Sequence, residues 1–208
     1  MLSKVSPRTD RRPRQRLDTQ ERRETILHAA GRCYAAAPYA DVSVAQVAEE
    51  AQSSPALVFH YFGSKAELFA EVVAASIAQL QAAQAAADAA LSPGVPARDR
   101  VRASLHVYLD HIASHPDAWA APLTGAGEPA EAVAVRQAAR ADYVRTLAAL
   151  LQPDTDRHDY ALWGYFGFLD QACLHWVRQG CPEQHRHSLV DAALGALEGA
   201  LGDWGRRA

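Results

Sequence analysis

Apolar side chains recur every three or four residues along most of the chain, which is the spacing of amphipathic helices. Alanine, the best helix former, is abundant, and no segment shows the strict alternation that is typical of strands. The pattern therefore predicts an all-α protein with about nine helices. The predicted helices span residues 18–37, 43–51, 54–63, 64–91, 98–114, a short segment ending at 119, 130–151, 156–178 and 183–203.

Residues that cap helices mark the beginning of several predicted helices. The pairs with capping-box spacing are Asp18 with Glu21, Ser43 with Gln46, and Ser64 with Glu67. Ser54 followed by Pro55 suits another helix start, and Gly63 can end that helix in the left-handed conformation. The two short helices on either side of residues 52–53 therefore have the dimensions of a helix-turn-helix.

A helical wheel of residues 55–62 separates the side chains into two faces. The outward residues are Pro55, Ala56, Phe59 and His60, and the inward residues are Val58, Tyr61 and Phe62. Polar groups that suit phosphate oxygens surround this segment: the hydroxyls of Ser43, Ser53 and Ser54, the free N–H groups of the helix ends, and the ammonium of Lys65. The pattern fits either an ordinary helical core with caps or a surface that binds nucleic acid.

Charge is distributed unevenly along the chain. The net charge is −3, but residues 1–65 carry +3 and residues 66–208 carry −6. Residues 1–17 form a basic arm, which we expect to be disordered and which suits a polyanion. Three cysteines indicate a reducing compartment, and we expect no secretory signal and no membrane span, hence a cytoplasmic protein.

Residues 22–73 resemble the DNA-binding region of TetR-type bacterial transcriptional regulators. The specific part of RRETILHAAGRCYAAAPYADVSVAQVAEEAQSSPALVFHYFGSKAELFAEVV is VAQVAEEA, a short turn, and a hydroxyl-started helix that ends in FHYFGSKAEL. The resemblance implies a homodimer that places residues 55–62 of each copy in the major groove of a palindromic double-stranded operator. It also implies a transcriptional regulator that responds to a ligand, with repression as the expected mode.

By this resemblance, seven residues occupy DNA-facing positions: Ser43, Ser54, Pro55, Ala56, Phe59, His60 and Lys65. We assign Ser43, Ser54 and Lys65 to phosphates, and Pro55, Ala56 and His60 to base edges. Two positions depart from the family pattern, which usually has tyrosine in place of Phe59 and glycine in place of Gln52. Gln52 must therefore tolerate a positive φ, or the turn differs.

The remaining residues, 65–208, are expected to form an effector-binding and dimerisation domain after a helix-turn-helix domain at 18–64. Residues 160–176, YALWGYFGFLDQACLHW, are apolar nearly all round, so this helix should be buried on two sides. We interpret it and the last helix as the four-helix bundle of the dimer, although packing within one subunit alone is the alternative.

The candidate ligand-lining residues are Tyr108, Trp119, Tyr143, Trp163, Phe166, Phe168 and Gln171. They suit an apolar or aromatic effector.

Other functions find less support in the sequence. Cysteine and histidine cluster at Cys173, His175, Cys181, His185 and His187, but their order fits no zinc-finger spacing, so we predict no metal and no cofactor. No nucleophile–base pair or glycine-rich phosphate loop indicates an enzyme. A helical adaptor that binds proteins without binding DNA is the main alternative.

Overall fold

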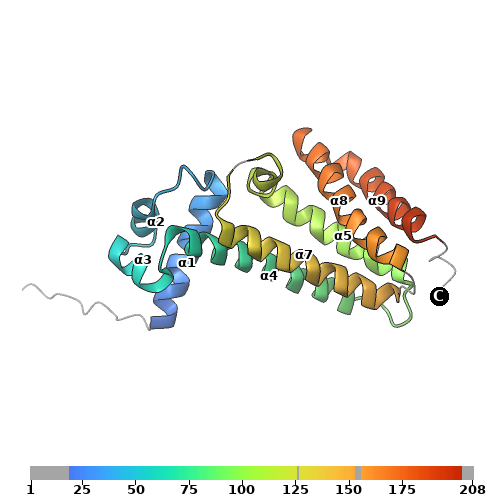
Figure 1. The fold of residues 1–208 in the computed structure, drawn as a ribbon, viewed down its shortest axis with the longest axis horizontal. Helices are drawn as coiled ribbons and strands as arrows, with labels where there is room; N and C mark the ends of the chain where they lie inside the picture. The colour runs from blue at the N-terminus through green and yellow to red at the C-terminus, as the bar shows by residue number, and fades with distance from the viewer. Residues whose placement is uncertain (1–18, 126, 153–155, 203–208) are drawn as a thin grey trace, which may run out of the picture.

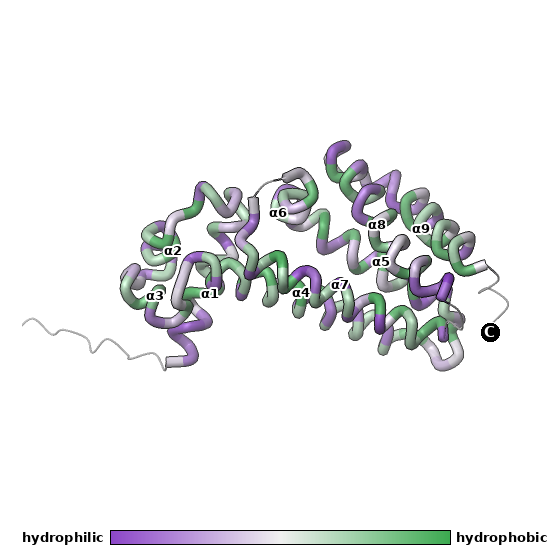
Figure 2. The backbone as a smooth tube through the Cα atoms, viewed as in Figure 1, coloured by the Kyte–Doolittle hydropathy of each residue, from purple (hydrophilic) through white to green (hydrophobic). Residues whose placement is uncertain are grey.

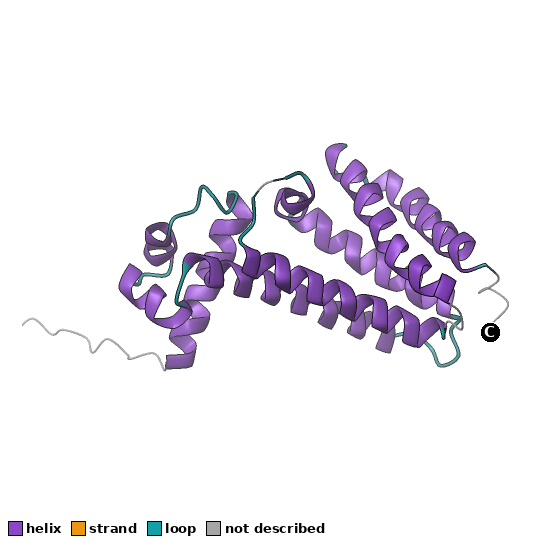
Figure 3. Ribbon diagram, viewed as in Figure 1, coloured by secondary structure: helices purple, strands orange, loops and turns teal. Residues whose placement is uncertain are grey.

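The structure is a computed structural model, and it describes residues 19–125, 127–152 and 156–202. The predicted basic arm at residues 1–17 lies outside these ranges. The described residues form helices and loops without a strand (Figure 3), which confirms the all-α prediction. The helices are α1 (Thr19–Ala36), α2 (Val44–Glu50), α3 (Pro55–Phe62), α4 (Lys65–Ala89), α5 (Ala97–Ser114), α6 (Pro116–Ala120), α7 (Ala130–Leu151), α8 (Asp156–Arg178) and α9 (Arg186–Leu201). Two 3₁₀ turns, Ala121–Leu123 and Glu183–His185, precede α7 and α9.

Helix ends agree closely with the prediction because side-chain caps fix them. Ser43, Ser54 and Ser64 each accept a hydrogen bond from the backbone N–H three residues ahead. Two ends differ from the prediction. The last helix begins with a 3₁₀ turn, so its α-helical part starts only at Arg186. Gly63 has a positive φ of 73°, but its ψ of −62° lies outside the left-handed helical region, so the predicted conformation was wrong in detail.

The N-terminal helices surround one hydrophobic core. α1, α2 and α3 pack around the first turns of α4 at one end of the elongated molecule (Figure 1). Buried members of this core include Ile26, Val47, Val58 and Leu68. With seven and eight residues, α2 and α3 are shorter than the 12–15 residues or so that an isolated helix needs, so packing must hold them in place.

A second core lies among α5, α7, α8 and α9. It contains Leu109, Leu162, Trp176 and Leu194, all nearly inaccessible to water. α4 and α7 lie side by side along the molecule and connect this core with the N-terminal one (Figure 1). Hydrophobic and hydrophilic segments alternate along both helices (Figure 2), as expected for helices that bury only one face.

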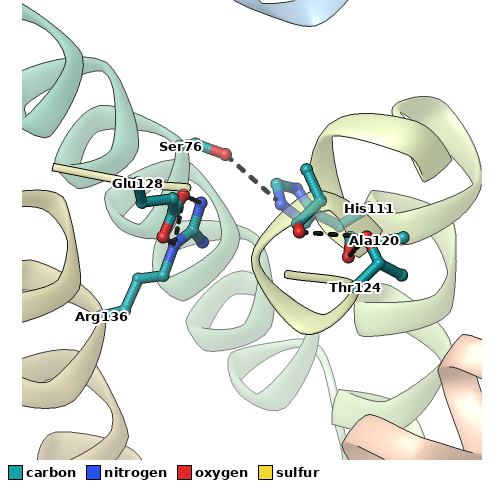
Figure 4. Close-up of polar contacts among 7 residues, drawn as sticks. Ser76, His111, Ala120, Thr124, Glu128 and Arg136 are labelled. Atoms are coloured by element: carbon teal, nitrogen blue, oxygen red, sulfur yellow. Dashed lines mark hydrogen bonds and ion pairs between the residues drawn. The ribbon is translucent and has the colours of Figure 1, made fainter. Parts of the chain in front are cut away.

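The beginning of α7 belongs to the N-terminal core. Ala132 is fully buried there, and Val135 packs against the same cluster. The segment before α7 is fastened by a bidentate ion pair, in which Arg136 donates to both carboxylate oxygens of Glu128 at 3.0–3.2 Å (Figure 4). α6 contacts α1 as well. The two cores are therefore joined through α4, α6 and α7 together.

Enlarging the buried side chain of Ala132 should loosen this junction. The substitution Ala132→Leu inserts three carbon atoms where the side chain has no exposed surface, and overpacking of this kind costs about 1–3 kcal/mol. Ala134→Leu on the exposed side of the same helix is the control and should change stability by less than about 0.5 kcal/mol. Chemical unfolding followed by circular dichroism measures both. Equal stability of the two variants would show that α7 is not part of the N-terminal core.

Candidate nucleic-acid interface

The connection between α2 and α3 is a tight turn that requires an unusual backbone conformation. Gln52 has a φ of 49°, a region that a non-glycine residue occupies at a cost on the order of 1 kcal/mol. Hydrogen bonds hold this turn, because the backbone N–H of Ser53 donates to the carbonyl oxygen of Ala48 at 2.8 Å. The predicted positive φ at residue 52 is therefore present, and the turn orients α3 against α2.

α3 buries one side and exposes the other. Val58 and Phe62 are 1% and 4% exposed, and the guanidinium of Arg23 lies 4.8 Å from the centre of the Phe62 ring. Pro55, Ala56, Phe59 and His60 are exposed, and the Phe59 ring is 47% accessible to water. The helical wheel thus assigned both faces correctly. The exposed face of α3 therefore presents one aromatic ring and one imidazole to the surroundings.

Ser43 and Ser54 keep a hydroxyl proton that can be donated outward. The oxygen of Ser43 accepts from the N–H of Gln46, and the oxygen of Ser54 accepts from the N–H of Leu57, both at 3.2 Å. An accepting hydroxyl still carries one donor, which suits a phosphate oxygen. Gln46 completes the capping box, because its side-chain oxygen accepts from the N–H of Ser43 at 2.7 Å.

Ser53 differs from its two neighbours. Its hydroxyl oxygen is buried and has no hydrogen-bond partner among the described residues. A phosphate contact through this oxygen would need a rotation of the side chain. The structure therefore places Ser53 beside the exposed surface rather than on it, whereas Ser43 and Ser54 lie on it.

Lys65 is the first residue of α4 and follows the N-cap Ser64. Its ammonium lies 4.2 Å from the centre of the Tyr39 ring, in the loop between α1 and α2. Ser43, Ser54 and Lys65 thus stand at the N-terminal ends of α2, α3 and α4. Partial positive charge from each helix end adds to the Lys65 cation. The outer face of α3 is therefore flanked by groups that favour phosphate.

The N-terminal sequence also matches a family model. Residues 26–72 match the model of bacterial regulatory proteins of the tetR family, over the described helix-turn-helix and the beginning of α4. The chain is thus similar to TetR-type regulators over this segment. The match lies within residues 22–73, where the sequence predicted this resemblance. Among curated proteins, no sequence match was found.

Solved structures of several bacterial regulators share the fold over most of the chain. A regulator from Streptomyces coelicolor is 17% identical, with a TM-score of 0.77 over 92% of this chain and 85% of that one. A TetR-like regulator from Rhodococcus sp. RHA1 is 24% identical, with a TM-score of 0.66 over 90% and 100%. The fatty acid degradation regulator FadR from Bacillus halodurans is 16% identical, with a TM-score of 0.65 over 87% and 95%.

Four of the predicted ligand-lining residues form two aromatic pairs on α5 to α8. The indole N–H of Trp119 donates to the hydroxyl of Tyr108 at 3.1 Å, and the rings of Tyr143 and Phe166 lie 6.2 Å apart. Burial raises the pKa of the Tyr143 hydroxyl to about 12, so it stays neutral at physiological pH. Tyr108, Trp119 and Phe166 pack against the second hydrophobic core.

The other three predicted ligand-lining residues lie elsewhere. Trp163, Phe168 and Gln171 are on the exposed face of α8, with Trp163 and Phe168 45% and 39% accessible. They therefore do not join Tyr108 and Phe166 inside the subunit. The sequence could not separate these residues because α8 carries aromatic side chains on both faces.

Sequence reasoning named Tyr143 but missed three other polar residues of α7 and α8, which are Tyr165, Arg140 and Asp170. The hydroxyls of Tyr143 and Tyr165 are buried and lack hydrogen-bond partners among the described residues. The guanidinium of Arg140 lies 5.4 Å from the centre of the Phe166 ring and donates to Asp170 at 2.7 Å. Tyr165 shares a helical face with Leu162, Leu169 and Cys173, and this spacing was the available signal.

Metal binding and membrane insertion find no support within the described ranges. His175 and His185 hydrogen-bond to the side chain of Gln179 at 2.9 and 3.1 Å, and no group of metal-ligating side chains gathers there or elsewhere in that part of the chain. None of the described helices combines the length and the apolar character that crossing a bilayer requires.

A half-buried histidine between α4 and α5 should make stability depend on pH. The Nε2 atom of His111 lies 3.4 Å from the hydroxyl of Ser76 (Figure 4). Burial, and secondarily the neighbouring His115, lower the pKa of His111 below its ordinary value of 6.5. The imidazole of His111 therefore binds a proton more readily in the unfolded chain than in the folded one. The stability that neutral His111 contributes is fully present above pH 6.5 and is lost as the pH falls from 6.5 through the folded-state pKa.

The substitution His111→Gln should therefore reduce the loss of stability between pH 7 and pH 5. Urea unfolding at each pH measures the effect. His106→Gln, at an exposed position of the same helix, is the control and should keep the wild-type dependence. An unchanged pH dependence in His111→Gln would show that His111 makes no contribution.

Proposed function

We propose that this chain is a ligand-responsive repressor that binds a palindromic operator as a homodimer. The observation that carries the proposal is the exposed face of α3, which the N-terminal core leaves uncovered between three capped or charged helix ends. An α-helix fits the major groove of B-DNA, and the groups around it match phosphates on either side. The TetR-type fold supports the DNA-binding part of the proposal.

Each exposed residue then has a specific role. Ala56 is small enough to contact a thymine methyl group, and the ring nitrogens of His60 can bond to a base edge. Phe59 offers only apolar contact, since it lacks the hydroxyl that the usual tyrosine would present to a phosphate. Ser43, Ser54 and Lys65 bind phosphates and fix the position of α3. Regulators of this kind are generally not enzymes, and the proposal assigns no catalytic residue.

The dimer forms through α8 and α9. α8 exposes Tyr160, Trp163 and Phe168, while its opposite face is buried in the second core. α9 places Ala192, Gly195 and Gly199 on its exposed side, where small side chains allow a second helix to approach closely. Burial of these three large aromatic rings would contribute several kcal/mol to the free energy of dimerisation, at about 25 cal/mol per Å² of apolar area. A second copy of the chain is the partner we propose.

The effector is an apolar or aromatic molecule that binds among α5 to α8. Tyr108, Trp119, Tyr143 and Phe166 supply aromatic contacts there, and the buried tyrosine hydroxyls supply donors. The similarity to a fatty acid degradation regulator is consistent with an apolar ligand. Ligand binding would move α4 and α7, and α7 carries Ala132 in the N-terminal core. The spacing of the two α3 helices, about 34 Å on a two-fold site, would change.

Operator binding is tested with the DNA that flanks the gene of this chain. The purified dimer should shift such a fragment in a gel, and its affinity should fall steeply with salt, as expected for phosphate contacts. A folded dimer that binds none of these fragments at low salt would contradict the proposal. Salt-insensitive binding to a protein instead of DNA would favour the adaptor alternative.

The base-contacting role of His60 predicts a loss of specificity. His60→Ala should weaken operator binding by about 5- to 100-fold for each subunit, the range for one lost base contact, and should leave binding to unrelated DNA nearly unchanged. His106→Ala, an exposed histidine far along the chain on α5, should bind the operator like the wild type. Competition titrations with both kinds of DNA measure the ratio. Equal losses on the two DNAs would assign His60 to the phosphate backbone.

The dimer interface predicts different outcomes for two equally exposed residues. Phe168→Glu places a charge on the proposed interface of α8 and should convert the dimer into a monomer. Val133 on α7 has the same exposed fraction, 39%, so Val133→Glu is the matched control and should remain a dimer. Sedimentation velocity measures the mass of each variant. A Phe168→Glu variant that stays dimeric would exclude this face of α8 as the interface.

A further inference from the structure

We infer that Tyr39 is a positioning residue for DNA binding, because its ring holds the ammonium of Lys65 ready for a phosphate. The inference rests on the proposed function, in which Lys65 contacts the operator backbone. Tyr39 lies in the loop between α1 and α2, and Lys65 begins α4. The ammonium nitrogen stands 4.2 Å from the ring centre, within the distance at which a cation is attracted by the electrons of an aromatic face.

The Tyr39 ring is itself fixed by two other aromatic rings. It lies 4.9 Å from the centre of the Phe69 ring, inclined at 49°, and 6.2 Å from the Tyr34 ring, at 23°. Phe69 and Tyr34 are buried in the N-terminal core. The partly buried Tyr39 side chain therefore cannot turn away from Lys65 without leaving these contacts. A rigid ring holds the flexible lysine side chain in one direction.

Helix stability does not explain why a lysine stands at the beginning of α4. A cation at the N-terminal end of a helix meets the positive end of the helix dipole, which is unfavourable. Within the described part of the chain, no carboxylate lies at ion-pair distance from Lys65 to offset this effect. The Tyr39 ring is the partner that the structure provides. Glu67 in the first turn of α4 offsets part of the positive helix end, but the Lys65 cation has no such carboxylate partner among the described residues and suits an anionic ligand such as DNA phosphate.

Because Lys65 is already held in place, its side chain loses less conformational entropy when DNA binds. A free lysine loses rotamer freedom when it is fixed on a phosphate, and a side chain already held by a ring loses less. The loop that carries Tyr39 also leads directly into Ser43, the N-cap of α2. Tyr39 thus links two phosphate-binding groups, one at the beginning of α2 and one at the beginning of α4, which lie 22 residues apart in sequence.

The experiment measures operator affinity at several salt concentrations for Tyr39→Phe, Tyr39→Leu, Lys65→Met and the double variant Tyr39→Leu with Lys65→Met. Tyr39→Phe keeps the ring and should bind within about twofold of the wild type. Tyr39→Leu should weaken binding by about tenfold for the dimer, from two lost cation–π contacts. Lys65→Met should reduce the salt slope by about 0.9 for each subunit. In the Lys65→Met background, Tyr39→Leu should cost less than about twofold.

A second pair of variants separates electrostatics from packing in case Tyr39→Leu does not fold. Incorporation of pentafluorophenylalanine at position 39 keeps the shape of phenylalanine but reverses the charge distribution of the ring face. This variant should bind the operator about tenfold more weakly than Tyr39→Phe, with the same thermal stability. Equal affinity of these two ring variants, or equal effects of Tyr39→Leu with and without Lys65, would overturn the inference. Failure of the folded wild type to bind any operator would instead refute the proposed function.

Discussion

The burial of one side of α3 is the constraint on which the rest of the structure depends. An eight-residue helix does not persist alone in water, so Val58 and Phe62 must be held in the N-terminal core for α3 to exist. Each of these side chains contributes about 1.5–3 kcal/mol when it is fully buried. The same geometry turns Ala56, Phe59 and His60 outward. The exposed surface is thus a direct consequence of the way the helix is anchored.

The anchoring elements also connect this surface with the helices around the second hydrophobic core. α4 supplies Leu68 to the N-terminal core and Ser76 to the contact with α5, and α7 supplies Ala132 to the same N-terminal core. Both helices therefore contact the core that holds α3 in place. Because two helices cross the junction, the orientation of α3 depends on their relative position and not on α4 alone. This arrangement gives a physical route by which a molecule among α5 to α8 could alter DNA binding.

Local patterns accounted for most of the fold and for the outer face of α3. Caps such as Ser43 and Ser54 act within three residues, so they could be found in the sequence, and the two faces of α3 follow from helical spacing. Contacts between distant segments could not be predicted in this way. Neither the burial of Ala132 beside the N-terminal helices nor the cation–π contact of Lys65 with Tyr39 leaves a local pattern. Because α8 carries aromatic residues on both faces, the sequence pattern could not show whether Phe166 or Phe168 points inward.

In the proposed complex, the exposed face of α3 contacts base edges in the major groove. A crystal structure of the chain bound to its operator would show whether this contact is made. We expect α3 of each subunit to lie in a major groove, with Ala56 and His60 against bases and Ser43, Ser54 and Lys65 against phosphates. A complex in which Phe59 and His60 are covered by protein, or in which α3 does not touch the DNA, would contradict the account.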